Sequence, residues 1–140
     1  DPISNTGFMY PKSLLNKLST NEASFFSKTI FTYGHDVSIQ MVDKGVIDAA
    51  SVHSLIYRYI ERNYPERVQN VKVINESQKF GMPPVVTPKN LDNKCFKRLQ
   101  NIFLTIDKDS TGTQIIEKLG IERFVKVNDT IYNSVRNLKK

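Results

Sequence analysis

The stretch TIFTYGHDVSIQMV, residues 29–42, places a strand pattern directly before a helix pattern. Residues 29–33 are β-branched or aromatic, which is typical of a short strand, and Gly34 marks a turn. From His35 onward, Ile39 and Val42 recur at helical spacing. The stretch therefore predicts a strand, a polar turn and a helix in succession, the unit from which α/β proteins are built.

The same alternation extends over the first half of the chain. Residues 46–52 are short and apolar, as expected of a buried parallel strand, and a helix follows that closes near Pro65. Residues 71–74 have the pattern of a third strand, and a capped helix is expected from about Ser4 to Leu18. Strands that alternate with helices imply an α/β fold with a parallel-rich sheet flanked by helices.

The second half of the chain has a different pattern. Residues 76–88 hold one glycine and three prolines around two valines, which predicts an extended crossing or hinge. Helices are expected over residues 96–106, 115–119 and 129–138. We therefore expect a boundary between two parts near residues 78–87.

Composition narrows the classes of partner. The formal charge is +6 in 140 residues, but the positive side chains are dispersed and do not interleave with aromatic residues as on a nucleic-acid platform. Only Cys95 is present, so neither a disulfide nor a thiolate metal site is expected. No stretch is apolar enough to cross a bilayer, and residues 1–7 do not resemble a signal peptide, so we expect the protein to include residues before Asp1.

The first candidate site is the polar trio Ser4, Asn5 and Thr6 ahead of Gly7. Hydroxyls, an amide and free backbone N–H groups converge there on the positive end of a helix dipole, an arrangement that can hold a tetrahedral oxyanion. The alternative is ordinary capping of the helix by Ser or Thr. The spacing alone leaves both readings open.

The second candidate site lies at the carboxyl ends of the expected strands, where open α/β sheets bind ligands. His35 can donate to an anion, Asp36 can cap the helix or orient the imidazole, and His53 ends the next strand at the same edge of the sheet. The alternatives are solvated histidines or a metal shared by the pair. No nucleophile motif, P-loop or dinucleotide fingerprint is present, so no catalytic residue, metal or cofactor is expected.

Several segments, in this order, resemble the PhnD-type solute-binding proteins of ABC transporters, which bind phosphonate, phosphite or phosphate in the periplasm. The resemblance covers nearly all of the chain. The matching segments are residues 1–7, 34–39, 45–54, 80–86, 119–124 and 132–135.

The resemblance implies a class II, Venus-flytrap fold of the periplasmic-binding-protein type, of which the chain supplies about half. Residues 1–79 would form the second lobe, and residues 80–140 the crossing and the returning helical part of an incomplete first lobe. The implied function is the solute-binding component of an importer, not an enzyme. It would be periplasmic or anchored to the cell envelope, with a small oxyanion ligand, a membrane permease as partner, no nucleic acid, and pairing of two copies as a further option.

The family pattern also assigns roles to single residues. Ser4, Asn5 and Thr6 match the trio that binds the phosphonyl oxygens, and His35 matches the histidine that contacts the same group. Asn5 departs from the Ser-Thr-Ser trio that the family often has, and His53 stands where relatives commonly place an aspartate. Two alternatives stay open: an extracellular sensor domain with the same fold, and a hydrolase or transferase that uses His35 or His53.

Overall fold

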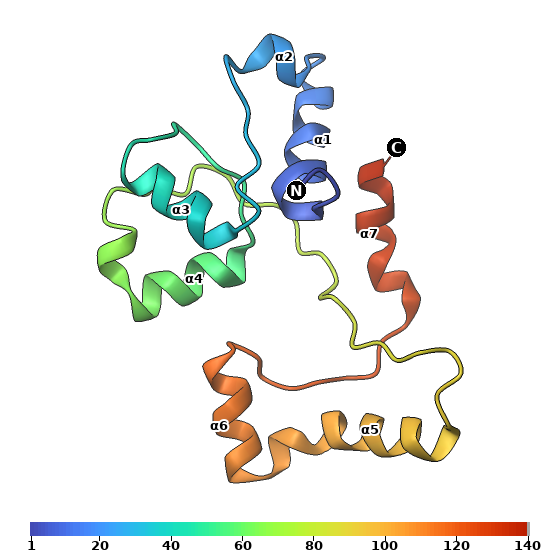
Figure 1. The fold of residues 1–140 in the computed structure, drawn as a ribbon. Coiled ribbons are helices and arrows are strands. Elements are labelled where there is room, and N and C mark those ends of the chain that lie inside the picture. Colours follow the sequence, from blue (N-terminus) through green and yellow to red (C-terminus); the bar gives the residue numbers. More distant parts are fainter. Residues whose placement is uncertain (140) are drawn as a thin grey trace. The chain divides into compact units, whose positions relative to one another are not determined.

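The computed structural model describes residues 1–139, which form two compact units. The first unit comprises Asp1–Phe80 and the C-terminal segment from Asn133, and the second comprises Gly81–Tyr132. Figure 1 shows the helices of each unit along the chain. None of the helices in the described part of the chain combines the length and apolarity that a membrane span requires.

The first unit is built from short helices. Its first helix opens with a π-helical turn, Asn5–Met9, and continues as α1 (Tyr10–Lys17). Pro11 is the second residue of α1, directly after the π-helical turn. The other helices of this unit are α2 (Glu22–Phe25), α3 (His35–Asp43), α4 (Ser54–Asn63) and α7 (Asn133–Arg136), with α1 spanning Tyr10–Lys17 and 3-10 turns at Pro65–Arg67 and Asn137–Lys139.

The apolar core of this unit lies between α3 and α4. Ile39 of α3 is 2% exposed, and it clusters with Ile60 of α4 and Val68. Val52, Tyr57 and Val71 pack around this cluster. Burial of each aliphatic side chain stabilises the folded state by about 1.5–3 kcal/mol. The cluster therefore holds α3 against α4, and α3 carries His35 at its first position.

The parallel sheet predicted from the sequence is not present among residues 1–139. Residues 29–33, 46–52 and 71–74 follow irregular paths between the helices, and several of their apolar side chains, such as those of Ile30 and Ile74, are exposed. Strand propensity is local, whereas a strand exists only when a neighbour supplies its ladder of hydrogen bonds. The expected helices of this half are found at α1, α3 and α4.

The second unit consists of α5 (Asn93–Thr105), a 3-10 turn at Ile106–Lys108, α6 (Ser110–Lys118) and a 3-10 turn at Asp129–Tyr132. Aspartates cap both helices: Asp92 accepts from the N–H groups of Lys94 and Cys95 at 3.0 Å, and Asp109 accepts from that of Gly112 at 2.9 Å. The single helix predicted over residues 129–138 is instead three short helical pieces, Asp129–Tyr132, Asn133–Arg136 and Asn137–Lys139.

Candidate functional site

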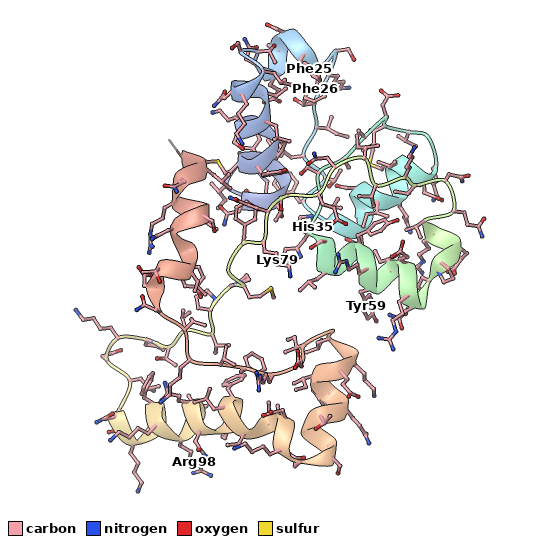
Figure 2. The ribbon with its side chains drawn as sticks, turned by 180° about the vertical axis from the view of Figure 1, so that it is seen from behind. Phe25, Phe26, His35, Tyr59, Lys79 and Arg98 are labelled. Carbon is pink, nitrogen blue, oxygen red and sulfur yellow. The ribbon has the colours of Figure 1, made fainter. Side chains whose placement is uncertain are left out.

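The first unit contains a cavity of about 950 Å³. Its walls come from the first helix as far as Asn16, from residues 21–35 with Ser38 and Met41 of α3, and from residues 46–51. Ser4 and His35 line this cavity together although 31 positions separate them in the sequence. Figure 2 labels His35, the first residue of α3, as well as Phe25 at the end of α2 and Phe26 directly after it.

The start of the first helix contributes Ser4 and Gly7 to the cavity wall. Ser4 has an extended backbone, and its hydroxyl oxygen accepts from the N–H of Gly7 at 3.0 Å. N–H groups in the first turn of a helix have no acceptor in the preceding chain, and the helix dipole makes this end positive. The Ser51 hydroxyl donates to the Thr6 carbonyl oxygen at 2.5 Å, which ties this turn to residues 48–52.

His35 is the first residue of α3, directly after Gly34 at the N-cap. Burial lowers the pKa of His35 below its ordinary value of 6.5. The nearby His53, whose ring centroid is 6.1 Å from that of His35, lowers this pKa further, Asp36 opposes the shift, and the chain N-terminus lowers the pKa slightly. The neutral imidazole is therefore favoured at neutral pH, and it can donate one hydrogen bond to an anion.

Two hydroxyls beside His35 escaped the sequence analysis. The Thr32 and Ser38 hydroxyl oxygens are 2.6 Å apart, and they lie 2.9 and 3.1 Å from the Gly34 carbonyl oxygen. Both residues line the cavity. Ser38 stands three residues after His35 on the expected helix, so helical spacing could have found it.

The cavity also contains lysines that the sequence analysis did not single out, Lys12 and Lys28. The Lys12 ammonium lies 5.7 Å from the centre of the Phe8 ring, within cation–π range. Asp1, Glu22 and Asp48 line the same cavity, so its wall carries charges of both signs.

The remaining predicted site residues do not line this cavity. Asn5 and Thr6 belong to the helix start itself. Asp36 faces a smaller cavity of about 440 Å³, which His35 also lines, together with Tyr59, Tyr64 and Arg67. Tyr59, which Figure 2 labels, lies within α4, and Tyr64 is the C-cap of this helix.

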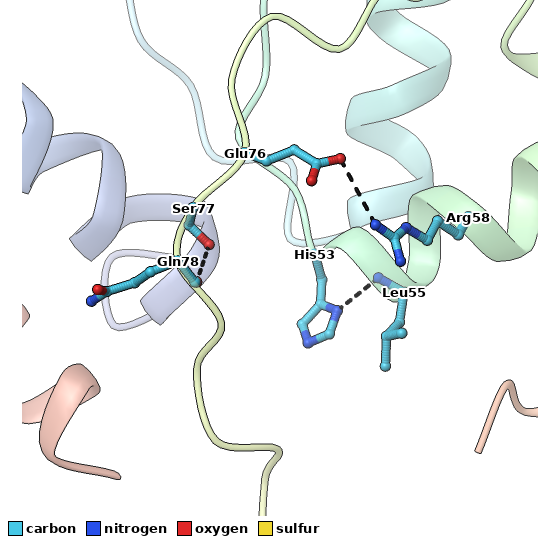
Figure 3. Close-up of polar contacts among 6 residues, drawn as sticks. All are labelled: His53, Leu55, Arg58, Glu76, Ser77 and Gln78. Atoms are coloured by element: carbon cyan, nitrogen blue, oxygen red, sulfur yellow. Dashed lines mark hydrogen bonds and ion pairs between the residues drawn. The ribbon is translucent and has the colours of Figure 1, made fainter. Parts of the chain in front are cut away.

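His53 serves as the N-cap of α4. Its Nδ1 atom accepts from the N–H of Leu55 at 3.2 Å, as Figure 3 shows. The same view shows the ion pair between Arg58 and Glu76, 3.8 Å apart and exposed to solvent. The alternative of a metal shared by the histidines gains no support, because no group of three metal-ligating side chains is found in the part of the chain that the structure describes.

The first helix also contacts the chain at the beginning of the expected hinge, residues 76–88. The Tyr10 hydroxyl donates to the Asn75 side-chain oxygen at 2.9 Å, and the Tyr10 ring packs edge-on against Phe80 at 6.0 Å between centroids. The chain leaves the first unit directly after Phe80. Residues 75–80 therefore have their own attachment to the helix that presents Ser4.

The sequence belongs to a defined class of transport proteins. Residues 1–132 match the family of ABC transporter, phosphonate, periplasmic substrate-binding proteins, so the chain is a member of this family. The family implies a fold of the periplasmic-binding-protein type.

Two curated relatives are similar to the chain at low identity. One is the probable ABC transporter phosphite binding protein PhnD1 of Prochlorococcus marinus (strain MIT 9301), which is 23% identical over 96% of this chain and 48% of that protein. Another is the phosphonates-binding periplasmic protein of Escherichia coli (strain K12), 25% identical over 99% of this chain and 40% of that protein. The chain thus spans about half the length of these relatives or less.

Proposed function

We propose that the chain is the oxyanion-binding part of the solute-binding component of an ABC importer, with a phosphonate, phosphite or phosphate-like ligand. The observation that carries the proposal is that Ser4 and His35 line one cavity in a chain of the phosphonate-binding family. The proposed role is binding and not catalysis, because the family description names a substrate-binding protein.

Ser4 and His35 supply donors at the cavity, whereas Asn5 and Thr6, which do not line it, are included because of the family resemblance. The ligand oxygens accept from first-turn N–H groups, from the side chains of Ser4, Asn5 and Thr6, and from the imidazole of His35. Asp36 orients this imidazole, and His53 lies at its other side, 6.1 Å away between ring centroids. Neutral donors suffice because the helix dipole supplies the positive potential.

In the whole protein we assign residues 1–79 to the second lobe and residues 80–140 to the crossing and the returning part of the first lobe. The parallel-rich sheet of the class II fold would form from residues 29–33, 46–52 and 71–74, whose β-branched and aromatic side chains suit strands. Closure around the ligand would bend the chain near residues 78–88.

The proposed partner is the membrane permease of the transporter, and the proposed location is the periplasm or the outer surface of an envelope membrane. The family description, which names a periplasmic substrate-binding protein, supports both.

Calorimetric titration with phosphate, phosphite and methylphosphonate tests the proposal. A hydrogen bond to a charged ligand is worth about 1.5–3 kcal/mol, so Ser4→Ala and His35→Ala should each weaken binding about 10- to 150-fold. The matched control is Ser24→Ala, because Ser24 is exposed and does not line the cavity. Absence of binding for all ligands in a protein extended to the length of its relatives would refute the receptor, and turnover of a phosphonate would favour an enzyme.

A further inference from the structure

The hydroxyl pair beside His35 uses up its own hydrogens. The Gly34 carbonyl oxygen has two lone pairs, and the N–H of Ser38 occupies one of them at 3.0 Å. The other lone pair can accept from the Thr32 hydroxyl, at 2.9 Å, or from the Ser38 hydroxyl, at 3.1 Å, but not from both. The hydroxyl that does not donate to Gly34 donates to its neighbour, 2.6 Å away. Neither hydroxyl therefore has a hydrogen left for a ligand.

Ser38 keeps unused acceptor capacity in both of these arrangements. A hydroxyl oxygen has two lone pairs, and the one protein hydroxyl that can donate to Ser38, among the hydrogen bonds of residues 1–139, is that of Thr32. At least one lone pair of the Ser38 oxygen is therefore free. The Thr32 oxygen is more fully used, because the N–H of Gly34 also approaches it, at 3.5 Å.

Ser38 brings this free acceptor to the candidate site. Ser38 and His35 both line the cavity, and their spacing of three positions places them on one face of α3. Ser4 lines the same cavity from the first helix. The cavity wall thus combines donors for oxyanion oxygens with an acceptor for a hydrogen. An oxyanion whose oxygens are all unprotonated has nothing to offer this acceptor, whereas a P–OH group has.

We propose that the Ser38 hydroxyl accepts a hydrogen bond from a protonated oxygen of the bound oxyanion and so determines specificity. The favoured ligands are phosphate, which keeps a P–OH group through the neutral range, and the singly charged forms of phosphite and phosphonates. Sulfate has the shape of phosphate but carries no hydrogen at neutral pH, so one of its oxygens would face a lone pair of Ser38. A bond with one ligand and a repulsion with the other both contribute to the discrimination. The inference rests on the proposed function, because it concerns how that site ranks its ligands.

Titration calorimetry with phosphate and sulfate, in a protein extended to the length of its relatives, tests the role of Ser38. The wild type should bind phosphate at least about tenfold more tightly than sulfate. Ser38→Ala should lower this ratio about five- to tenfold, because alanine suits a helix but has no acceptor. The matched variant Thr32→Val should change the ratio less than about threefold, since Ser38 can then donate to Gly34 and keep its lone pairs. In Thr105→Ala, which removes a hydroxyl bonded at 2.8 Å to the carbonyl four residues earlier in α5, neither affinity should change.

A pH profile with methylphosphonate gives a second measurement, because this ligand loses its P–OH group when it becomes doubly charged. Its affinity should fall at least about tenfold from about pH 6 to about pH 8.5 in the wild type, and less in Ser38→Ala. Titration of His35 is common to both proteins, so the difference between the two profiles isolates Ser38. Circular dichroism checks that the variants retain their helices.

The outcomes separate this inference from the proposed function. Equal affinity of the wild type for phosphate and sulfate, or a Ser38→Ala protein with the wild-type ratio and pH profile, would overturn the role of Ser38 and leave the oxyanion receptor standing. If phosphate does not bind and methylphosphonate does, the pH profile alone decides. Binding of none of these ligands would refute the receptor and the inference together.

Discussion

Ser4 both caps a helix and faces the cavity, and two substitutions separate these roles. Its hydroxyl makes one capping bond, 3.0 Å from the N–H of Gly7. Replacing an N-cap serine by alanine costs about 1 kcal/mol of stability, whereas glycine costs only a few tenths. Both substitutions remove the hydroxyl from the cavity equally. Ser4→Ala should therefore destabilise the protein more than Ser4→Gly, while both variants lose similar affinity for the oxyanion.

Two measurements on the same samples follow these effects. Urea unfolding without ligand gives the stability change, and titration calorimetry with phosphite or methylphosphonate gives the affinity change, expected at about 10- to 150-fold for both variants. Ser13→Ala is a matched control, because the Ser13 hydroxyl donates to the Tyr10 carbonyl oxygen within α1 and the residue does not line the cavity. A Ser4→Gly protein that binds as tightly as the wild type would show that Ser4 acts only as a cap.

Three further predictions concern stability. Because the folded state lowers the pKa of His35, the unfolded chain binds the proton more readily, and the free energy of unfolding should fall as the pH drops below 6.5. His35→Gln should reduce the difference in this free energy between urea titrations at pH 7.5 and at pH 5.5. Ile39→Ala should cost about 2–5 kcal/mol in urea unfolding, against less than about 1 kcal/mol for Ile115→Ala; equal losses would contradict the core assignment. Gly112→Ala should cost about 1–3 kcal/mol or more, because its Cβ would lie 2.0 Å from the Ile106 carbonyl oxygen, and an unchanged melting temperature would refute this packing.

The helices could be predicted because their signals are local. Each helix start is indicated by the residue directly before it: Gly34 for α3, His53 for α4 and Asp92 for α5. α2 was missed, since its four residues carry no repeating apolar pattern. The sheet did not follow from the same reasoning, because strand pairing joins segments far apart in the chain, and residues 29–33 have no such partner among the described residues.

Only the part of the candidate site that depends on local motifs could be predicted from the sequence. Motifs selected Ser4 and His35, and the structure brings them to one cavity. Thr32 was missed because its contact with Ser38 depends on how the chain turns at Gly34. The roles of all six predicted residues as ligand contacts stay predictions: Ser4, Asn5, Thr6, His35, Asp36 and His53.

The capping bond of His53 has a consequence for the kinds of ligand atom that it can meet. Because Nδ1 accepts from the N–H of Leu55, the neutral ring must carry its proton on Nε2. The outward edge of this ring is therefore a donor in both of its protonation states, and it can pair with an oxygen but not with an ammonium group. A carboxylate at this position would accept a hydrogen bond from an amino substituent of the ligand, whereas the ring in this tautomer cannot.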